Sequence, residues 1–225
     1  WGYFPGFMAG WRASEEGFWR DNIPFINYFK LRASWGKMGM DPGTAFQYMN
    51  SFGLGGGMSF GTSAAIESVV GPPTIANPNI TWETQTTRNV GFESKWLNDL
   101  IHWNFEFFKN KREDILAPRD ASVPDFTGLS LPNENIARVD NSGFEMEAGV
   151  HKNLTADLRL DVSGNLSYNH NKVVFKDEPE RAVPWQRETG HPYNAWLMYK
   201  CIGVFADDAA VKNYPAWTGA KPGDL

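Results

Sequence analysis

Residues 77–96 (NPNITWETQTTRNVGFESKW) decide the fold of this 225-residue chain. In the second half of this stretch apolar residues alternate with polar ones, so that Val90, Phe92 and Trp96 share one face of an extended strand. Residues 101–116 (IHWNFEFFKNKREDIL) repeat the same period of two. Only about four residues separate the two runs, which is a connection length typical of a β-hairpin.

Further segments carry the same alternation, and together with the hairpin they predict an all-β fold of about six antiparallel up-and-down strands. The expected strands cover residues 3–14, 28–38, 81–96, 101–114, 138–151 and 156–170. In the later strands one face is apolar, whereas the other carries acids, amides and hydroxyls that a dry core would not tolerate unpaired.

The connections between these strands are alternately short and long, and this favours a transmembrane β-barrel. Outer-membrane barrels have short periplasmic turns and long extracellular loops. We therefore expect residues 1–170 to be barrel strands with their loops and residues 171–225 to be an extracellular loop region. Residues 39–76 are expected to be a loop in which residues 63–70 (SAAIESVV) form at most a short helix.

Basic residues flank the apolar part of the hairpin, before it on the first strand and after it on the return strand. Arg88 has the parity of the apolar face, but only about 10 residues are needed to cross the hydrocarbon. Arg88 is therefore expected at the outer headgroup boundary, and Lys109, Lys111 and Arg112 fall at the same level of the return strand. Trp35, Trp96, Trp103 and Tyr168 lie near strand ends, as in the aromatic girdles of barrels.

The composition excludes several classes of protein. A formal net charge of −5 argues against nucleic acid as a partner. Cys201 is the single cysteine, so no internal disulfide can form. No run approaches the ~20 consecutive apolar residues of a transmembrane helix. Barrel strands remain compatible with all of these observations, because their hydropathy signal is weak.

No catalytic, metal or cofactor site is expected. Residues 57–61 (GMSFG) match the G-x-S-x-G pattern of a nucleophile elbow, but they lie in a glycine-rich stretch of an antiparallel pattern, where an α/β sheet would be required. The four histidines are dispersed and lack metal-ligand spacing. Carboxylates on the neighbouring late strands could suggest acid/base chemistry, but a hydrated lumen wall explains them better. The expected lumen-facing residues are Glu145, Glu147, Asp157, Arg159 and Asp161.

Aromatic residues of the last loop are the best candidates for contact with a substrate or a protein partner. They are Trp185, Tyr193, Trp196, Tyr199 and Trp217. Exposed aromatic faces stack on sugar rings or anchor a protein lid. An equally good interpretation is a hydrophobic cluster that gives the loop its shape.

Several segments resemble the SusC/RagA family of TonB-dependent outer-membrane transporters, and the similarity runs through nearly the whole chain. The most specific segment is residues 77–93 (NPNITWETQTTRNVGFE), which is similar to the family's NPNLKWE signature. The other segments are GYFPGFMAGWRASEEGF (2–18), FKLRASWGKMG (29–39), FEFFKNKREDILAP (105–118), NIARVDNSGFEMEAG (135–149) and GHPYNAWLMYKCIGVFADDAAV (190–211).

This resemblance implies import of large glycans or oligopeptides across the outer membrane of a Gram-negative bacterium. It further implies a SusD-like surface lipoprotein as a lid, contact with membrane lipid, and energy supplied by TonB through an N-terminal region. Six strands cannot close a wide barrel, so we expect a fragment from which the plug domain and the TonB box are absent. The alternative is a soluble β-sandwich that binds carbohydrate, in which Leu31, Phe92, Phe105, Phe144 and Leu160 would meet across a central core.

Overall fold

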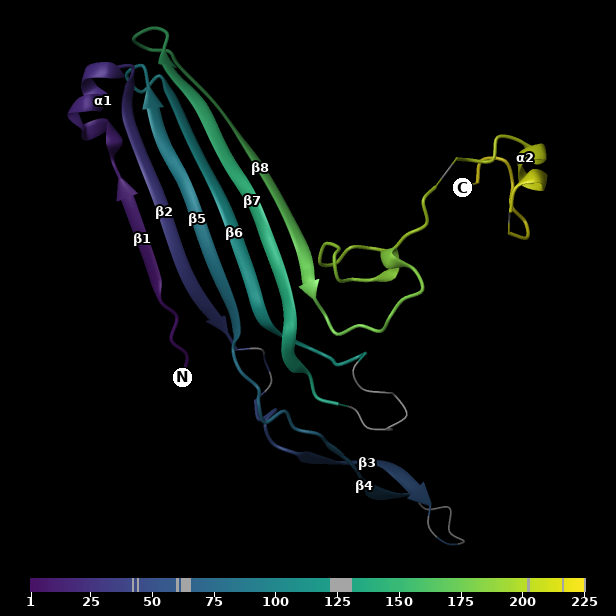
Figure 1. Ribbon diagram of the computed structural model, residues 1–225. Coiled ribbons are helices and arrows are strands. Elements are labelled where there is room, and N and C mark those ends of the chain that lie inside the picture. The colour runs from purple at the N-terminus through teal and green to yellow at the C-terminus, as the bar shows by residue number, and fades with distance from the viewer. Residues whose placement is uncertain are drawn as a thin grey trace. The chain divides into compact units, whose positions relative to one another are not determined.

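A six-stranded antiparallel sheet dominates the computed structural model, which describes residues 1–41, 43, 45–59, 61, 66–121, 131–201, 203–215 and 217–224. The strand order is β1-β2-β5-β6-β7-β8, and each strand pairs with its neighbours in the sheet (Figure 1). The strands are β1 Gly6–Trp11, β2 Ile26–Met40, β5 Glu83–Trp96, β6 Ile101–Ala117, β7 Glu134–Asn153 and β8 Arg159–Phe175. The predicted all-β antiparallel fold is confirmed, although β1 is shorter than expected and β7 is longer.

The long connection between β2 and β5 contains a hairpin that the sequence did not predict. Its strands are β3 (Ser51–Ser59) and β4 (Ile66–Thr74), which pair only with each other among the described residues. The helix expected at residues 63–70 is therefore wrong from Ile66 onward, and residues 63–65 lie outside the described residues. Ile66, Val69 and Val70 are β-branched, which favours the extended conformation over a helix.

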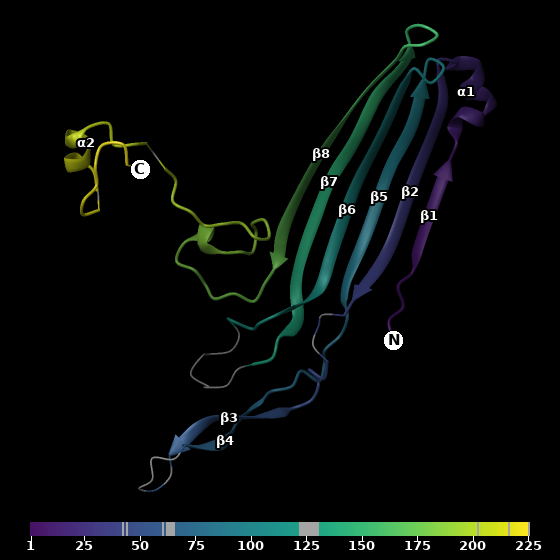
Figure 2. The ribbon, with the colours of Figure 1, turned by 180° about the vertical axis from the view of Figure 1, so that it is seen from behind.

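Short connections lie at one end of the sheet and long connections at the other (Figures 1 and 2). The first short connection contains η1 (Ala13–Glu15) and α1 (Gly17–Asn22), and the other two are residues 97–100 and 154–158. Leu97, with a φ of 53°, begins three consecutive residues in the left-handed region, which turns the chain tightly between β5 and β6. This alternation of connection lengths is the one that the sequence predicts.

The strand registers collect the apolar side chains on one face of the sheet, called the outward face below. One row across the strands joins Trp11, Leu31, Phe92, Phe105, Met146 and Leu166. Phe92 stacks on Phe105 with 5.9 Å between ring centroids, and Phe105 stacks on Phe144 at 6.0 Å. Cross-strand aromatic contacts of this kind stabilise a sheet without a second layer above it.

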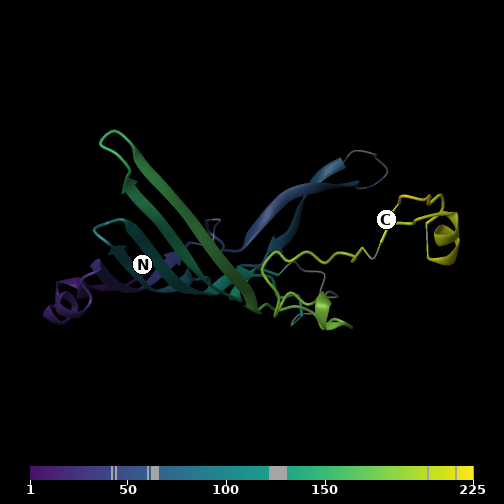
Figure 3. The same cartoon turned by 90° about the horizontal axis from the view of Figure 1, so that it is seen from above.

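No second sheet covers the outward face within the described part of the chain, and Figure 3 shows the six strands as a single curved layer. The buried apolar residues among those described are few and small: Ala13, Ala117, Ala137 and Val173. Leu31, Val90, Phe107 and Leu166 remain exposed. The sandwich alternative is therefore wrong, because the described residues form no central core between two sheets. No described helix has the length and apolar character needed to cross a membrane.

The chain divides into two compact units, Trp1–Asn194 and Ala195–Leu225. The first contains the sheet, and its last part holds η3 (Pro184–Gln186). The second contains α2 (Asp208–Asn213), whose first turn is capped by the Asp207 carboxylate, which accepts a hydrogen bond from the Ala210 amide at 2.7 Å. The expected boundary at residue 170 separates barrel strands from an extracellular loop region. Because it concerns position relative to the membrane, it stays a prediction.

Candidate functional site

The polar side chains that alternate with the outward face occupy the opposite face of the sheet, called the polar face below. Strand periodicity puts every second residue of each strand there, and the registers align these residues in rows. Its charged members include Lys30, Arg32, Lys95, Glu93, Glu106, Glu145, Glu147 and Asp161. This face is the candidate functional site of the sheet.

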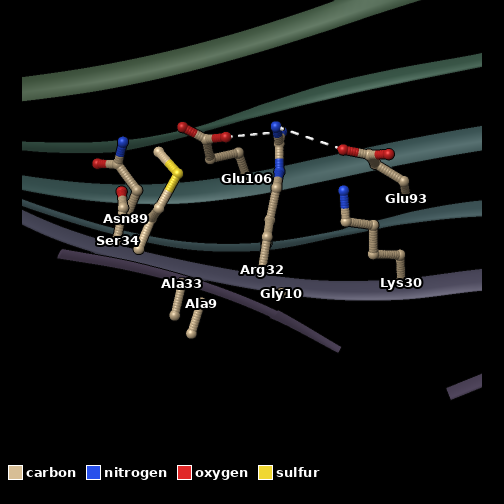
Figure 4. A pocket seen from close by; sticks show the side chains of 11 residues that line it. Ala9, Gly10, Lys30, Arg32, Ala33, Ser34, Asn89, Glu93 and Glu106 are labelled. Carbon is tan, nitrogen blue, oxygen red and sulfur yellow. Dashed lines mark ion pairs between the residues drawn. The ribbon is translucent and has the colours of Figure 1, made fainter. Parts of the chain in front are cut away.

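Arg32 is the central cation of the polar face. Its guanidinium lies 2.6 Å from the Glu106 carboxylate on β6 and 3.5 Å from the Glu93 carboxylate on β5. Figure 4 shows the three side chains on one side of the sheet, whereas Ala9 and Ala33 project from the other side. The groove around Arg32 has a volume of about 420 Å³ and opens to solvent. One arginine therefore holds carboxylates from two strands in an open, hydrated setting.

Glu145 and Glu147 continue this acidic surface on β7. Glu106 pairs directly with Glu145 in the strand register, so two carboxylates face the same space. A second groove, which includes Arg32 and Glu106, is lined by both β7 glutamates and by Asn165 of β8. Both side chains are exposed, and Glu147 lies 3.8 Å from His102 Nε2. The structure thus brings these two predicted residues together on one wall.

Asp161 and Arg159 lie near the beginning of β8, close to two stacked histidines. The His102 and His151 rings are 4.7 Å apart and nearly parallel. His151 Nδ1 lies 2.5 Å from the Asp161 carboxylate, to which Arg159 donates at 3.0 Å. Asp157 is not on the strand as expected, because β8 begins only at Arg159 and residues 154–158 form the connection from β7.

The arrangement of these groups offers no evident acid/base pair. Asp161 already accepts from His151 and Arg159, and the two β7 glutamates stand in one open environment, whereas glycosidic catalysis needs two carboxyl groups in different environments. Ser59 of the G-x-S-x-G pattern ends β3 of the hairpin and does not stand at a strand-to-helix turn. Over the described ranges, no three His, Cys, Asp or Glu side chains are placed to hold a metal ion.

The five predicted loop aromatics are divided between the two compact units. Trp185 and Tyr193 belong to the first unit, and both are exposed. The other three belong to the second unit, where Trp217 meets Phe205 edge-on at 6.4 Å. Trp196 is 84% exposed, so it has an accessible ring face. Trp217 thus has a ring contact within its unit, and all five side chains are exposed. Contact with a ligand and a hydrophobic cluster both stay predictions.

The loop that carries Trp185 is fastened to the end of β8. The Val173 amide donates to the His191 carbonyl at 2.9 Å, and the Gly190 amide donates to the Val173 carbonyl at 2.8 Å. Partial burial opposes ionisation of Glu178, but the backbone amides of Glu188 and Thr189 donate to it at 2.8 Å each. These hydrogen bonds hold the pKa of the Glu178 carboxyl below its ordinary value.

Sequence reasoning missed a polar network that joins the strands at the end with the long connections. The Asn135 side chain donates to the carbonyls of Thr81 and Asp114 at 3.0 and 2.7 Å, and it accepts from the Thr81 amide at 3.0 Å. Buried Asn77 donates to the Asn133 carbonyl at 2.9 Å. These partners are more than 50 positions apart in two of the three cases, so no local pattern reveals them. The segment 77–93, which is most specific for the family, therefore begins with residues that hydrogen-bond to the start of β7 and the residue before it.

The chain matches a family model described as "TonB dependent receptor-like, beta-barrel" over residues 1–218. Among curated proteins, it is 29% identical over 179 residues to the TonB-dependent receptor SusC of Bacteroides thetaiotaomicron, covering 77% of this chain and 17% of that protein. It is 25% identical over 242 residues to the TonB-dependent receptor P3 of Formosa agariphila, covering 99% of this chain and 22% of that protein. The chain thus spans 17–22% of the length of these relatives.

Solved structures show the same fold. The RagAB peptide importer in its open-open state superposes with a TM-score of 0.67 at 17% sequence identity, covering 85% of this chain and 20% of that one. The structure of the RagAB peptide transporter gives a TM-score of 0.63 at 18% identity, covering 84% of this chain and 20% of that one. The resemblance to SusC/RagA proteins inferred from the sequence motifs is confirmed.

Proposed function

Because this chain belongs to the TonB-dependent receptor-like β-barrel family, we propose that it is part of a transporter that imports large nutrients, either glycans or oligopeptides. TonB-dependent receptors reside in the Gram-negative outer membrane and are transporters, not enzymes. The sequence predicts no catalytic site, and this expectation agrees with membership of the family. The proposal concerns the substrate, the partners and the transport activity of the whole protein.

The observation that carries the proposal is the pairing of an apolar and a polar face on one uncovered sheet. The outward face exposes Leu31, Val90, Phe107 and Leu166, which would be costly in water. Lipid contact removes this cost. The polar face presents Arg32 and its glutamates, which belong in a hydrated lumen. On this interpretation Glu145, Glu147, Arg159 and Asp161 line the lumen.

The connection lengths support an orientation in the membrane. Barrels of this type have short turns in the periplasm and long loops outside the cell. The connection that contains η1 and α1 and the turns at residues 97–100 and 154–158 would then face the periplasm. Residues 171–225 and the β3–β4 hairpin would face the exterior, where a nutrient first meets the protein.

A surface lipoprotein of the SusD type is the proposed partner, and TonB would supply energy through the N-terminal part of the whole protein. Support for the lipoprotein comes from the exposed rings of Trp185, Tyr193, Trp196 and Tyr199, since large uncovered aromatics favour a protein or sugar contact. A fold neighbour is itself described as a peptide importer, which keeps oligopeptides among the candidate substrates.

Uptake by the native bacterium tests the proposal. Cells carrying the full-length receptor are supplied with fluorescent oligopeptides and fluorescent oligosaccharides, and accumulation is compared with that of a receptor deletion and a TonB deletion. We expect accumulation of one class of nutrient that requires both genes. Accumulation that persists without TonB would contradict the proposal.

A variant with Trp185→Ala and Tyr193→Ala identifies what the loop contacts. We expect accumulation to fall at least about tenfold, since contact aromatics commonly contribute 2 kcal/mol or more. The matched control is Phe107→Ala, an exposed aromatic of the outward face. Recovery of the lipoprotein with the purified receptor is measured in parallel: lost recovery assigns the aromatics to the partner, and retained recovery assigns them to the nutrient.

A further inference from the structure

Cations gather on the outward face immediately beyond its apolar band. In one row of the register Trp35 pairs with Arg88, and Arg88 pairs with Lys109. In the next row Thr86 pairs with Lys111. The full second row is Lys37, Thr86, Lys111, Asp140 and Lys172. Five basic residues from four strands therefore share this part of the surface with one carboxylate.

These cations differ from Arg32 and Arg112 of the polar face, each of which contacts a carboxylate. On the polar face Arg32 contacts Glu93 and Glu106, and Arg112 contacts Glu83. Among the described residues, by contrast, no carboxylate lies within 4.0 Å of the side-chain nitrogens of Arg88, Lys109, Lys111 or Lys172, and all four residues are exposed. The two rows thus form a surface of net positive charge, with Asp140 as their single carboxylate.

The distance of the cations from the opposite end of the apolar band matches the thickness of a bilayer. From Trp96 back to Arg88, and from Ile101 to Lys109, each strand covers about 9 residues, and a tilted strand needs about 9–11 to cross the hydrocarbon. On the outward face, Val90 and Phe107 are the last apolar residues before Arg88 and Lys109. The charges therefore begin where the hydrocarbon ends and the headgroups start.

We propose that Arg88, Lys109, Lys111 and Lys172 bind the phosphate groups of anionic lipids in the outer leaflet. Phosphate oxygens accept charge-assisted hydrogen bonds from guanidinium and ammonium groups, and the acyl chains of the same lipid would lie on Val90 and Phe107. Assignment to the outer leaflet rests on the membrane orientation proposed above. Lipid explains both parts of the surface, because a single lipid molecule carries both phosphate groups and acyl chains.

Lipid retention by the purified full-length receptor tests this surface. The receptor in neutral detergent is incubated with diphosphoryl lipid A, and the retained lipid and apparent Kd are measured by native mass spectrometry. Variant Lys109→Gln/Lys111→Gln is expected to weaken binding about tenfold to thirtyfold, because each cation near an anionic surface contributes about 1 kcal/mol. Control variant Lys212→Gln/Lys221→Gln removes the same charge from the second unit and is expected to bind like the unaltered receptor.

Two further arms identify the ligand. Lipid A from which the phosphates have been removed is expected to be retained weakly, and inorganic phosphate in excess is expected not to displace the intact lipid. Equal binding by the double variant and the control, or equal binding of the dephosphorylated lipid, would overturn the proposal. Displacement by inorganic phosphate would overturn the assignment to lipid. Heat-dependent gel migration verifies that each variant is a folded barrel, and nutrient uptake is measured separately, so the two proposals can fail independently.

Discussion

Arg112 on β6 and Glu83 on β5 form an ion pair in which the guanidinium lies 2.5 Å from a carboxylate that is only 6% exposed. The second oxygen of Glu83 accepts a hydrogen bond from the Leu116 amide at 3.1 Å. This pair joins the first residue of β5 to Arg112 in the last third of β6, near the long connections. It holds β5 and β6 together at the end of the sheet that carries the long loops, where strands would otherwise fray.

Removal of Arg112 is predicted to be more harmful than removal of the charge of Glu83. Arg112→Met leaves a buried carboxylate with one amide donor, and it is expected to lower the free energy of unfolding by about 2–3 kcal/mol, less than for a wholly buried pair because Arg112 is partly exposed. Glu83→Gln keeps an acceptor for Leu116 and leaves a solvated cation, so its cost is smaller. Urea unfolding of the full-length receptor in lipid vesicles measures both, and the opposite order would contradict the role of the pair.

Gly143 on β7 is predicted to tolerate no side chain. A Cβ there would press against the carbonyl oxygen of Tyr168 and lie 2.9 Å from the Asn169 Cα on β8. Because these are backbone atoms of a paired strand, Gly143→Ala is expected to cost about 1–3 kcal/mol of unfolding free energy. The measurement is the urea midpoint in vesicles.

The control for this substitution is Gly164→Ala on β8, where a Cβ meets nothing within 4 Å. Alanine there is expected to be neutral or to stabilise slightly, because it reduces the freedom of the unfolded chain. If both alanine variants unfold at the same urea concentration, the close approach of β7 and β8 at Gly143 has no energetic effect.

The alternation of side chains predicted most of the sheet, because the face on which a side chain lies depends on the local sequence. Strand period is a local property, so Phe92 and Phe105 could be assigned to one face without any knowledge of pairing. The β3–β4 hairpin was missed because β3 is rich in glycine, which is depleted in strands. Its partner strand, which contains Val69 and Val70, lies further along the chain. The glycine-rich composition of β3 predicted a loop, whereas its pairing with β4 makes it a strand.

The candidate site was less predictable because its contacts join different strands. Glu145 and Glu147 could be assigned to the polar face from parity alone. Nothing in the sequence pairs Arg32 with Glu93 and Glu106, since these residues are brought together by the order β2-β5-β6. The basic row of the outward face was predicted in part, because Arg88, Lys109 and Lys111 lie on the two strands of one hairpin, whereas Lys172 joins it only through the pairing of β7 with β8.

The loop held by Glu178 is predicted to loosen in acid. Because hydrogen bonds lower the pKa of this carboxyl in the folded loop, its ionised form stabilises the loop above the ordinary glutamate pKa. That stabilisation is lost as the pH falls through the lower, folded value. Hydrogen exchange at the amides of Glu188 and Thr189 should therefore lose protection in mild acid, after correction for the intrinsic rate.

Glu178→Gln separates this effect from general acid unfolding. The variant keeps one oxygen acceptor but carries no charge, so its two amides should show weaker protection at neutral pH and no additional loss in acid. The amides of β6 serve as the internal reference, because they belong to the paired sheet. An equal pH dependence in the variant and the unaltered protein would assign the loosening to another group.

Neighbouring positions on β6 distinguish the lipid-facing side from the lumen. Phe105 belongs to the outward face, where it contacts Phe92 and Phe144, and Asn104 belongs to the polar face beside the β7 glutamates. Phe105→Lys would place an ammonium group in hydrocarbon, at a cost of about 2–4 kcal/mol near the middle of the bilayer. Asn104→Lys would place the same group in water near carboxylates and is expected to cost less than about 1 kcal/mol. The folded fraction of the full-length receptor in vesicles, measured by heat-dependent gel migration, should fall for Phe105→Lys alone. The reverse result would mean that the aromatic rows face the lumen, and it would overturn the assignment of both faces.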